Sequence, residues 1–271
     1  MNDFSAIAPT YRESSSAQRA ASGLVFDLLA IGPRDDVLDL GCGTGHLTQK
    51  IAAMTSGAVA GTDPSPGMIA EARREAPAIP FRVEAAEALD EPASYDVIFC
   101  NSAFHWFVDP ARVLANCLAA LRPGGRMAIQ APARRDYCPE FIAAVEALRR
   151  DARTRDVSAG FTSPWLFLES ADEYAQLFRE AGFRVASATI ETLTERCTPA
   201  KAMGVFETGA AAGYLNPASY EGGADEAYLA AARSVIAGGL RAQVDGAGFM
   251  SLTFNRIYLL AVKPGDRRPR A

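Results

Sequence analysis

The sequence contains few of the residues that build metal sites and disulfide frameworks. Its 271 residues include only 2 histidines and 5 cysteines. The cysteines form no Cys-x-x-Cys pair, and His46 and His105 lack the His-Glu-x-x-His spacing of a zinc site. The sequence therefore predicts neither a metal site nor a disulfide framework, and its cysteine usage fits a reducing compartment.

A basic surface and a long apolar run are also missing. Lys and Arg total 27 against 32 for Asp and Glu, a net charge of −5, which argues against a nucleic-acid partner. No stretch reaches the roughly 18 uncharged apolar residues of a membrane span. The first residues carry Asp3 and lack the apolar run of a secretion signal. We therefore expect a cytoplasmic protein without a membrane partner.

Hydrophobic periodicity in the first half of the chain alternates between strands and helices. The expected strands are 35–40, 58–63, 81–83, 95–101 and 126–131, the last preceded by a Gly-Gly turn at 122–125. The expected helices are 14–31, 46–54, 66–75 and 110–121. Strands that alternate with helices predict a parallel, doubly wound α/β sheet with right-handed crossovers.

The second half of the chain loses this regular alternation. Its pattern indicates an Arg-rich helix over 139–156, an aromatic connector over 161–170, a helix over 171–181, a strand over 183–193, helical stretches over 200–213 and 225–242, and a closing strand over 249–263. We expect a frayed tail after it. The predicted organisation is a helical arm over 1–34, a core over 35–133 and 170–198, cap insertions over 134–169 and 199–248, and a final core strand with the tail over 249–271.

A glycine-rich turn follows the first expected strand, in the run Asp39-Leu-Gly-Cys-Gly-Thr-Gly45. Glycines at this place let a ligand approach the backbone at a helix N-terminus. His46 stands where the dinucleotide fingerprint has its third glycine, and no Gly-Lys pair is present to hold phosphates. Asp63 ends the next strand and can accept both hydroxyls of a ribose. The pattern predicts a nucleoside cofactor without phosphates, S-adenosylmethionine.

The chain resembles the class I S-adenosylmethionine-dependent methyltransferases through four motifs: VLDLGCGTGHL at 37–47, GTDPSPGM at 61–68, YDVIFCNSAFHW at 95–106 and LRPGGRM at 121–127. The resemblance implies a Rossmann-like, seven-stranded sheet whose last strand is antiparallel. Residues 10–25 are similar to the opening of the malonyl-acyl-carrier-protein O-methyltransferases. The run Asn-Ser-Ala-Phe-His-Trp resembles those enzymes and the trans-aconitate methyltransferases.

The resemblance also assigns roles to single residues. It implies that the three glycines of the turn line the methionine part of the cofactor, that Asp39 places its amino group and that Asp63 holds its ribose. Asn101 would lie beside the methionyl carbons, and Tyr11 would close over the cofactor. The implied cofactor-binding set is Asp39, Gly41, Gly43, Gly45, Asp63, Pro64, Met68, Ala86 and Asn101.

One position departs from the family pattern at the adenine end. Where the family often has Asp or Asn followed by Ala-Glu, this chain has Ala85-Ala86-Glu87. The Ala85 side chain cannot form hydrogen bonds. Adenine recognition would therefore rest on the backbone amide of Ala86 and on packing.

His105 and Trp106 follow the fourth strand and are predicted to face the substrate that accepts the methyl group. His105 either takes a proton from the acceptor or orients it, and a structural role for both residues is equally open. Arg134 and Arg135, just after the fifth strand, are candidates to pair with an acidic substrate. The connector aromatics, among them Trp165 and Phe167, form either core or an apolar roof over the substrate.

These observations predict a methyltransferase that O-methylates a carboxylate of a small acid or of an acyl chain on a carrier protein, with His105, Trp106 and Tyr11 as catalytic candidates. An alternative is a protein that binds S-adenosylmethionine but is diverted to cyclase, isomerase or regulatory function. A nicotinamide-dependent oxidoreductase is a third, weaker reading. Release of S-adenosylhomocysteine separates the first two.

Overall fold

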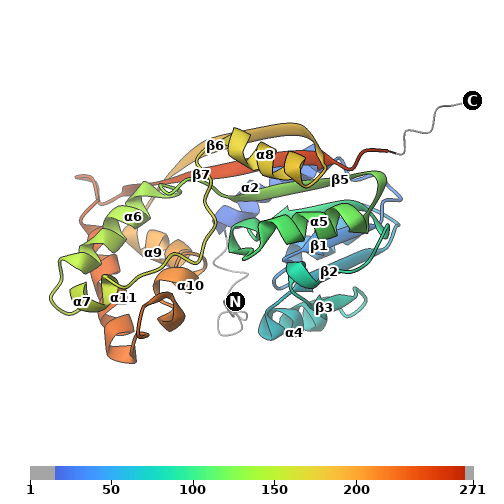
Figure 1. Cartoon of the computed structure of the whole chain (residues 1–271). Helices are drawn as coiled ribbons and strands as arrows, with labels where there is room; N and C mark the ends of the chain where they lie inside the picture. Colours follow the sequence, from blue (N-terminus) through green and yellow to red (C-terminus); the bar gives the residue numbers. More distant parts are fainter. Residues whose placement is uncertain (1–15, 266–271) are drawn as a thin grey trace, which may run out of the picture.

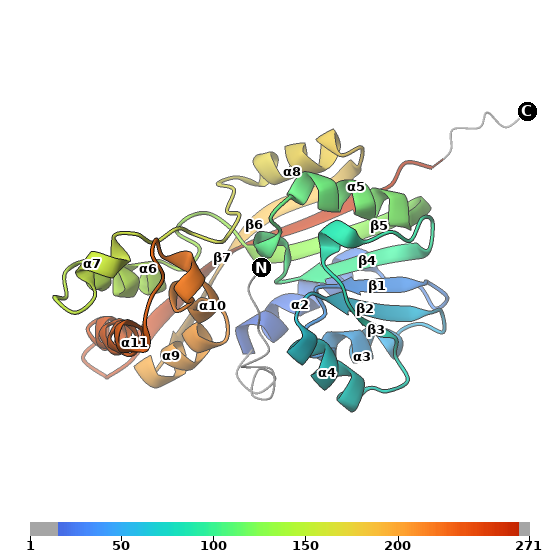
Figure 2. The ribbon, with the colours of Figure 1, turned by 60° about the horizontal axis from the view of Figure 1, so that its bottom comes forward.

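The structure is a computed structural model and describes residues 16–265, with side chains from residue 23 onward. These residues form a twisted sheet covered by helices, with a helical cap beyond one end of the sheet (Figures 1 and 2). The strands are β1 (Val37–Leu40), β2 (Val59–Asp63), β3 (Phe81–Val83), β4 (Tyr95–Asn101), β5 (Leu121–Pro132), β6 (Arg184–Cys197) and β7 (Met250–Val262).

The seven strands lie in the order β3-β2-β1-β4-β5-β7-β6. The pairs among β1 to β5 are parallel, whereas β7 is antiparallel to both β5 and β6. This topology confirms the predicted doubly wound sheet and its antiparallel last strand. From β1 the chain adds β2 and β3 on one side of the sheet and then returns to add β4 and β5 on the other side. The carboxyl ends of β1 and β4 therefore lie at a topological switch point, where ligands of such sheets bind.

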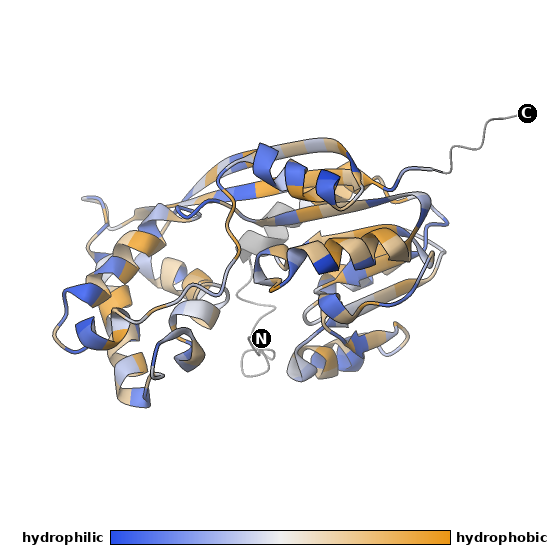
Figure 3. Cartoon of the chain, in the orientation of Figure 1, coloured by the Kyte–Doolittle hydropathy of each residue, from blue (hydrophilic) through white to orange (hydrophobic). Residues whose placement is uncertain are grey.

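Helices pack on both faces of the sheet. The helices of the sheet unit are α2 (Ser16–Leu29), α3 (His46–Ala52), α4 (Pro66–Glu75), α5 (Pro110–Ala120) and α8 (Ala171–Glu180), with 3₁₀ turns η2 (Ala86–Ala88) and η3 (Phe104–Trp106). One apolar cluster joins α5 and α8 to the sheet, and another joins α2 and α3 to the opposite face. Hydropathy colouring shows apolar central strands between helices of mixed colour (Figure 3). No helix within residues 16–265 is long and apolar enough to cross a membrane.

Several local predictions agree with the structure residue by residue. The strands 81–83 and 95–101 and the helix 66–75 have the predicted bounds. Ser65 caps that helix, since its Oγ accepts a hydrogen bond from the amide of Met68. The residues predicted as a turn before the fifth strand, 122–125, lie inside β5, which begins at Leu121. The chain is irregular there, because the register with β4 passes from Tyr95–Leu121 to Val97–Arg126 and Gly124 has a φ of 81°, while the Gly124–Gly125 backbone pairs with Lys263 after β7.

The predicted helix over 139–156 is also wrong. It is divided into α6 (Pro139–Glu146), the 3₁₀ turn η4 (Ala147–Arg149) and α7 (Arg155–Ser158). Asp151 accepts hydrogen bonds from the backbone and the guanidinium of Arg153, and the Thr154 hydroxyl donates to the carbonyl of Leu148. These local side-chain bonds compete with helical backbone bonds and end the helix.

Strands β6 and β7 run past the rest of the sheet and carry the cap (Figure 1). The cap contains α6, η4, α7, α9 (Pro199–Glu207), α10 (Ala211–Tyr214), η5 (Pro217–Ser219) and α11 (Glu226–Arg241). The stretch predicted as one helix over 200–213 breaks at Thr208, whose hydroxyl donates to the carbonyl of Val205. The two segments predicted as separate caps share one apolar core, in which α6 packs against α11.

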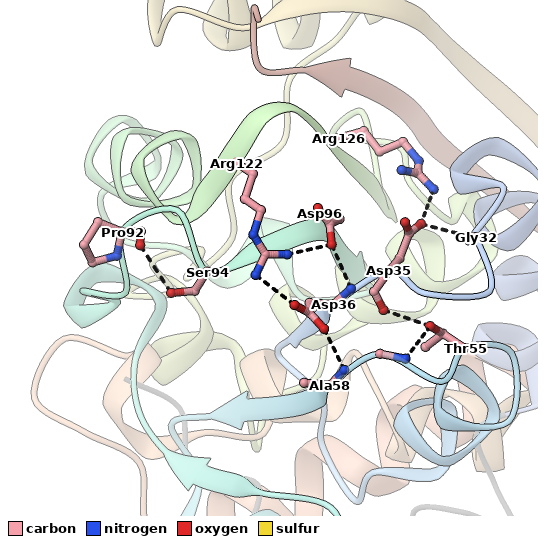
Figure 4. A network of polar contacts seen from close by, with 11 residues as sticks. Gly32, Asp35, Asp36, Thr55, Ala58, Pro92, Ser94, Asp96, Arg122 and Arg126 are labelled. Carbon is pink, nitrogen blue, oxygen red and sulfur yellow. Dashed lines mark hydrogen bonds and ion pairs between the residues drawn. The ribbon is translucent and has the colours of Figure 1, made fainter.

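An ion-pair network fixes the opposite end of the strands (Figure 4). The Arg122 guanidinium contacts Asp36 at 2.8 Å and Asp96 at 2.6 Å. Asp36 also accepts a hydrogen bond from the amide of Ala58. The Ala58 amide, followed by Arg122, lowers the pKa of Asp36. The network therefore joins the starts of β1, β2 and β4 to β5 and leaves their carboxyl ends free for a site.

Candidate active site

The glycine turn between β1 and α3 forms the floor of a cleft at the carboxyl edge of the sheet. Gly41 has a φ of 77° and approaches Ala103 so closely that a Cβ there would lie 2.3 Å from the Ala103 Cβ. Gly43 has a φ of 54°, and a Cβ on it would meet nothing within 4 Å. The turn thus needs glycine for its backbone shape and presents bare backbone to the cleft.

Asp63, at the end of β2, holds this turn in place. Its Oδ2 accepts a hydrogen bond of 3.0 Å from the amide of Gly43, and its Oδ1 accepts one of 2.9 Å from the amide of Ser65. Each carboxylate oxygen keeps further acceptor capacity. Pro64 and Met68, which follow Asp63, also line the cleft.

Asp39 lies at the inner end of the same half of the cleft. It is buried, and its Oδ2 accepts a hydrogen bond of 2.6 Å from the Thr48 hydroxyl. Burial raises the pKa of Asp39 to about 7, and the nearby Asp63 carboxylate adds to this rise against the lowering by Thr48. The two acids create a negative region that favours a cationic group of a ligand.

The opposite wall of this half comes from β3, η2 and β4. Ala85, Ala86 and Asn101 line it. Asn101 Oδ1 and Thr44 Oγ1 are buried without a hydrogen-bond partner in the described part of the chain. Buried polar atoms usually have partners, so these two atoms fit a polar ligand. These groups together fit S-adenosylmethionine. The two acids suit its ammonium group and its ribose hydroxyls, and the glycine turn and the unpartnered oxygens suit its polar methionine part.

His105 and Trp106 lie in the second half of the cleft, on η3. His105 is buried, and its Nδ1 has no hydrogen-bond partner within residues 16–265. Burial, followed by the nearby Arg256 guanidinium, lowers the pKa of His105 to about 3. The imidazole is therefore neutral near pH 7, and it is a weak base that cannot hold a proton there.

The aromatic connector, residues 161–170, covers the half of the cleft that contains His105, so it contributes to the cleft as well as to the core. Trp165 and Phe167 line the cleft together with Tyr137 from the start of the cap. Phe167 stacks on Tyr137 at a centroid distance of 5.0 Å and on His105 at 6.3 Å. The amide of Leu166 donates a hydrogen bond of 2.9 Å to the His105 carbonyl, which fixes the connector to η3.

The arginine of the cleft is Arg256, which the sequence analysis missed. Arg256 lies on β7, is buried and lines the cleft near His105, in the half that is called the acceptor half below, whereas Arg134 and Arg135 do not line the cleft. The Arg135 side chain is 90% exposed and faces Glu169 at 3.5 Å. A sequence signal for Arg256 did exist, since this charged residue directly precedes the apolar run Ile-Tyr-Leu-Leu-Ala-Val at 257–262.

Twelve site residues were predicted, and ten of them line one cleft. The lining includes Asp39, Gly41, Gly43, Asp63, Pro64, Met68, Ala86, Asn101, His105 and Trp106. Gly45 lies one turn further, at the N-cap of α3. Tyr11 lies outside the described residues. Within residues 16–265 no group of three or more His, Cys, Asp or Glu side chains could hold a metal ion.

Residues 14–188 match a protein family described as "Methyltransferase domain". The chain is 38% identical over 97 residues to the trans-aconitate 2-methyltransferase of Methylobacterium nodulans, covering 35% of this chain and 38% of that protein. It is 36% identical over 128 residues to the malonyl-[acyl-carrier protein] O-methyltransferase of Hahella chejuensis, covering 46% of each. The matched segments thus span less than half the length of these two relatives.

The fold is similar to that of a solved methyltransferase. The phosphoethanolamine N-methyltransferase 2 of Haemonchus contortus, in complex with S-adenosyl-L-methionine, aligns with a TM-score of 0.53 at 19% identity. The alignment covers 91% of this chain and 52% of that chain. At this identity the likeness concerns the fold.

Proposed function

Because this chain belongs to the class I S-adenosylmethionine-dependent methyltransferases, we propose that it transfers the methyl group of that cofactor to a carboxylate oxygen of an acid. The observation that carries the proposal is the buried guanidinium of Arg256 beside a neutral His105 in the acceptor half of the cleft. A guanidinium is always ionised and matches a carboxylate with two parallel hydrogen bonds.

The relatives support the same class of acceptor. The names of two of them specify trans-aconitate and malonyl-acyl carrier protein, which both carry free carboxylates. A small acid or a carrier-bound acyl chain is therefore the acceptor we propose for this chain.

The cofactor supplies an electrophilic methyl group, and the protein aligns the acceptor with it. Asp39 would hold the amino group and Asp63 the ribose. Arg256 binds the acceptor carboxylate, and the Trp165–Phe167 roof excludes water from the reacting atoms. A carboxylate is ionised near neutral pH and needs no base.

His105 then orients the acceptor and takes no proton. Its lowered pKa leaves the ring neutral, and its buried Nδ1 offers one more polar contact in the cleft. An alcohol acceptor would need a base of pKa near the working pH, which this imidazole does not provide.

The test is to incubate the protein with S-adenosylmethionine and carboxylic acids and to measure S-adenosylhomocysteine and methyl esters by mass spectrometry. We expect both products in equal amounts, and Arg256→Met should raise the KM for the acid while the affinity for S-adenosylhomocysteine stays the same. Cofactor binding without either product would instead support the diverted cyclase, isomerase or regulatory reading.

A further inference from the structure

We propose that the acceptor site selects a single carboxylate attached to an apolar body and discriminates against di- and tricarboxylates. This inference rests on the proposed function and specifies its substrate class. It also separates this chain from a relative named for trans-aconitate, which carries three carboxylates.

The charges around the cleft provide the first argument. Among the described residues that line it, the acids are Asp39, Asp63, Glu84 and Glu87, and Arg256 is the sole arginine or lysine. One guanidinium can pair with one carboxylate in the bidentate way. Within the described residues, each further carboxylate of a substrate would therefore lie in the cleft without an arginine or lysine to pair with.

The polar groups near Arg256 are mostly engaged with the protein itself. The Thr208 hydroxyl donates to the Val205 carbonyl, and the Asn255 side chain donates to the Asp136 carbonyl and accepts from the Thr192 hydroxyl. The negative Glu191 lies opposite Arg256 in the β6–β7 register, but it is exposed and does not line the cleft. The Tyr137 hydroxyl lines the cleft without a hydrogen-bond partner within residues 16–265, but a neutral hydroxyl does not compensate the charge of a further carboxylate.

The shape of the acceptor half provides the second argument. Its walls are aromatic rings in contact: Trp165 stacks on Phe167 at a centroid distance of 5.7 Å and lies tilted against Trp106 at 5.5 Å. On the side of β7, the Phe254 ring lies 5.1 Å from the Arg256 guanidinium carbon. The wall is closed by Phe141, Val205 and Ala210 from the cap. Such walls gain free energy from an alkyl or aromatic body and none from a carboxylate.

The experiment measures kcat/KM for methyl-ester formation with acetate, butyrate, hexanoate, octanoate, cinnamate and trans-aconitate at saturating S-adenosylmethionine. We expect kcat/KM to rise about fourfold per buried methylene along the aliphatic series. Cinnamate or octanoate should exceed trans-aconitate at least about 100-fold. Calorimetric titration of the protein–S-adenosylhomocysteine complex with octanoate should show binding that Arg256→Met removes.

Two different failures are distinguishable. A kcat/KM for trans-aconitate equal to or above that of octanoate would overturn the selectivity and leave carboxyl methylation standing. A kcat/KM that does not rise with chain length from acetate to octanoate would also overturn the selectivity and leave carboxyl methylation standing. Absence of any methyl ester with all six acids, with S-adenosylhomocysteine still bound, would overturn the proposed function together with this inference.

Discussion

The backbone amide of Gly43 donates a 3.0 Å hydrogen bond to the carboxylate of Asp63, which ends the neighbouring strand. The bond joins the two elements that would hold the methionine part and the ribose of the cofactor: the turn after β1 and the carboxyl end of β2. Since Asp63 also accepts from the amide of Ser65, one side chain sets both the turn and the start of α4.

Asp63→Ala should reduce the affinity for S-adenosylhomocysteine at least about 100-fold. The substitution removes the acceptor for two backbone amides and for the ribose hydroxyls, and hydrogen bonds to a charged group contribute about 1.5–3 kcal/mol each. Isothermal titration calorimetry measures the loss. Asp151→Ala is a matched control, because it removes an aspartate of the cap, remote from the cleft. Unchanged affinity of the Asp63 variant would contradict the assigned role.

Asp39 should make the ligand-free protein less stable as the pH rises. Its folded-state pKa is about 7, above the usual value near 3.8, so the folded state binds the proton more tightly than the unfolded state. Stability from this group is complete at low pH and falls between about pH 4 and pH 7. We expect the Tm of the wild type to fall over this range more than that of Asp39→Asn. Parallel Tm curves for the two proteins would argue against a raised pKa.

His105 should contribute no inflection to the pH dependence of kcat/KM between pH 5 and pH 9. Its pKa of about 3 keeps it neutral throughout this range. An inflection caused by Asp39 would be present in the wild type and in His105→Asn alike, so an inflection is assigned to His105 only when the variant loses it. Loss of an inflection near pH 6.5 in His105→Asn would show a base and refute the orienting role. A lower kcat with the same profile shape would support it.

The succession of strands and helices in the first half of the chain was predictable, because short apolar runs and glycine turns mark it. The strand β4 and the helix α4 with its Ser65 cap could be bounded from the sequence alone. The cap was less predictable, because local bonds of Asp151, Thr154 and Thr208 interrupt stretches whose composition favours helix.

The acceptor side shows why a site is harder to predict than a fold. Arg134 and Arg135 follow a parallel strand at its carboxyl end, where ligands usually bind, yet they do not line the cleft. Arg256 reaches it from the antiparallel strand β7, whose register brings a late residue beside Pro132. Pro132 and Arg256 are far apart in the sequence, so their proximity follows from the pairing of β5 with β7 and not from any local pattern.

Arg122→Ala should lower the free energy of unfolding by about 1 kcal/mol and leave cofactor affinity unchanged. The guanidinium forms two ion pairs at the amino ends of the strands, and partly exposed pairs contribute about 0–1 kcal/mol each. Urea unfolding measures the change, which should shrink at high salt. A loss of cofactor affinity would mean that the two ends of the sheet are coupled.

Gly213→Ala should weaken acceptor binding without affecting the cofactor. A Cβ at Gly213 would lie 2.2 Å from the Trp165 ring, so the added methyl group must displace the roof of the acceptor half. Overpacking of this kind costs about 1–3 kcal/mol of stability. We expect a several-fold higher KM for the acid and an unchanged Kd for S-adenosylhomocysteine, measured by steady-state kinetics and calorimetry.

Gly204→Ala provides the matched control for this variant. Gly204 lies in α9 of the same cap and is exposed, and a Cβ there meets nothing within 4 Å. The change should stabilise the helix by up to about 1 kcal/mol. The KM for the acid and the Kd for S-adenosylhomocysteine should stay as in the wild type. If Gly213→Ala behaves like this control, the Trp165 ring has room to move and does not set the acceptor KM. If only Gly213→Ala raises the KM, the tight contact between the cap and the connector determines how the acceptor is held.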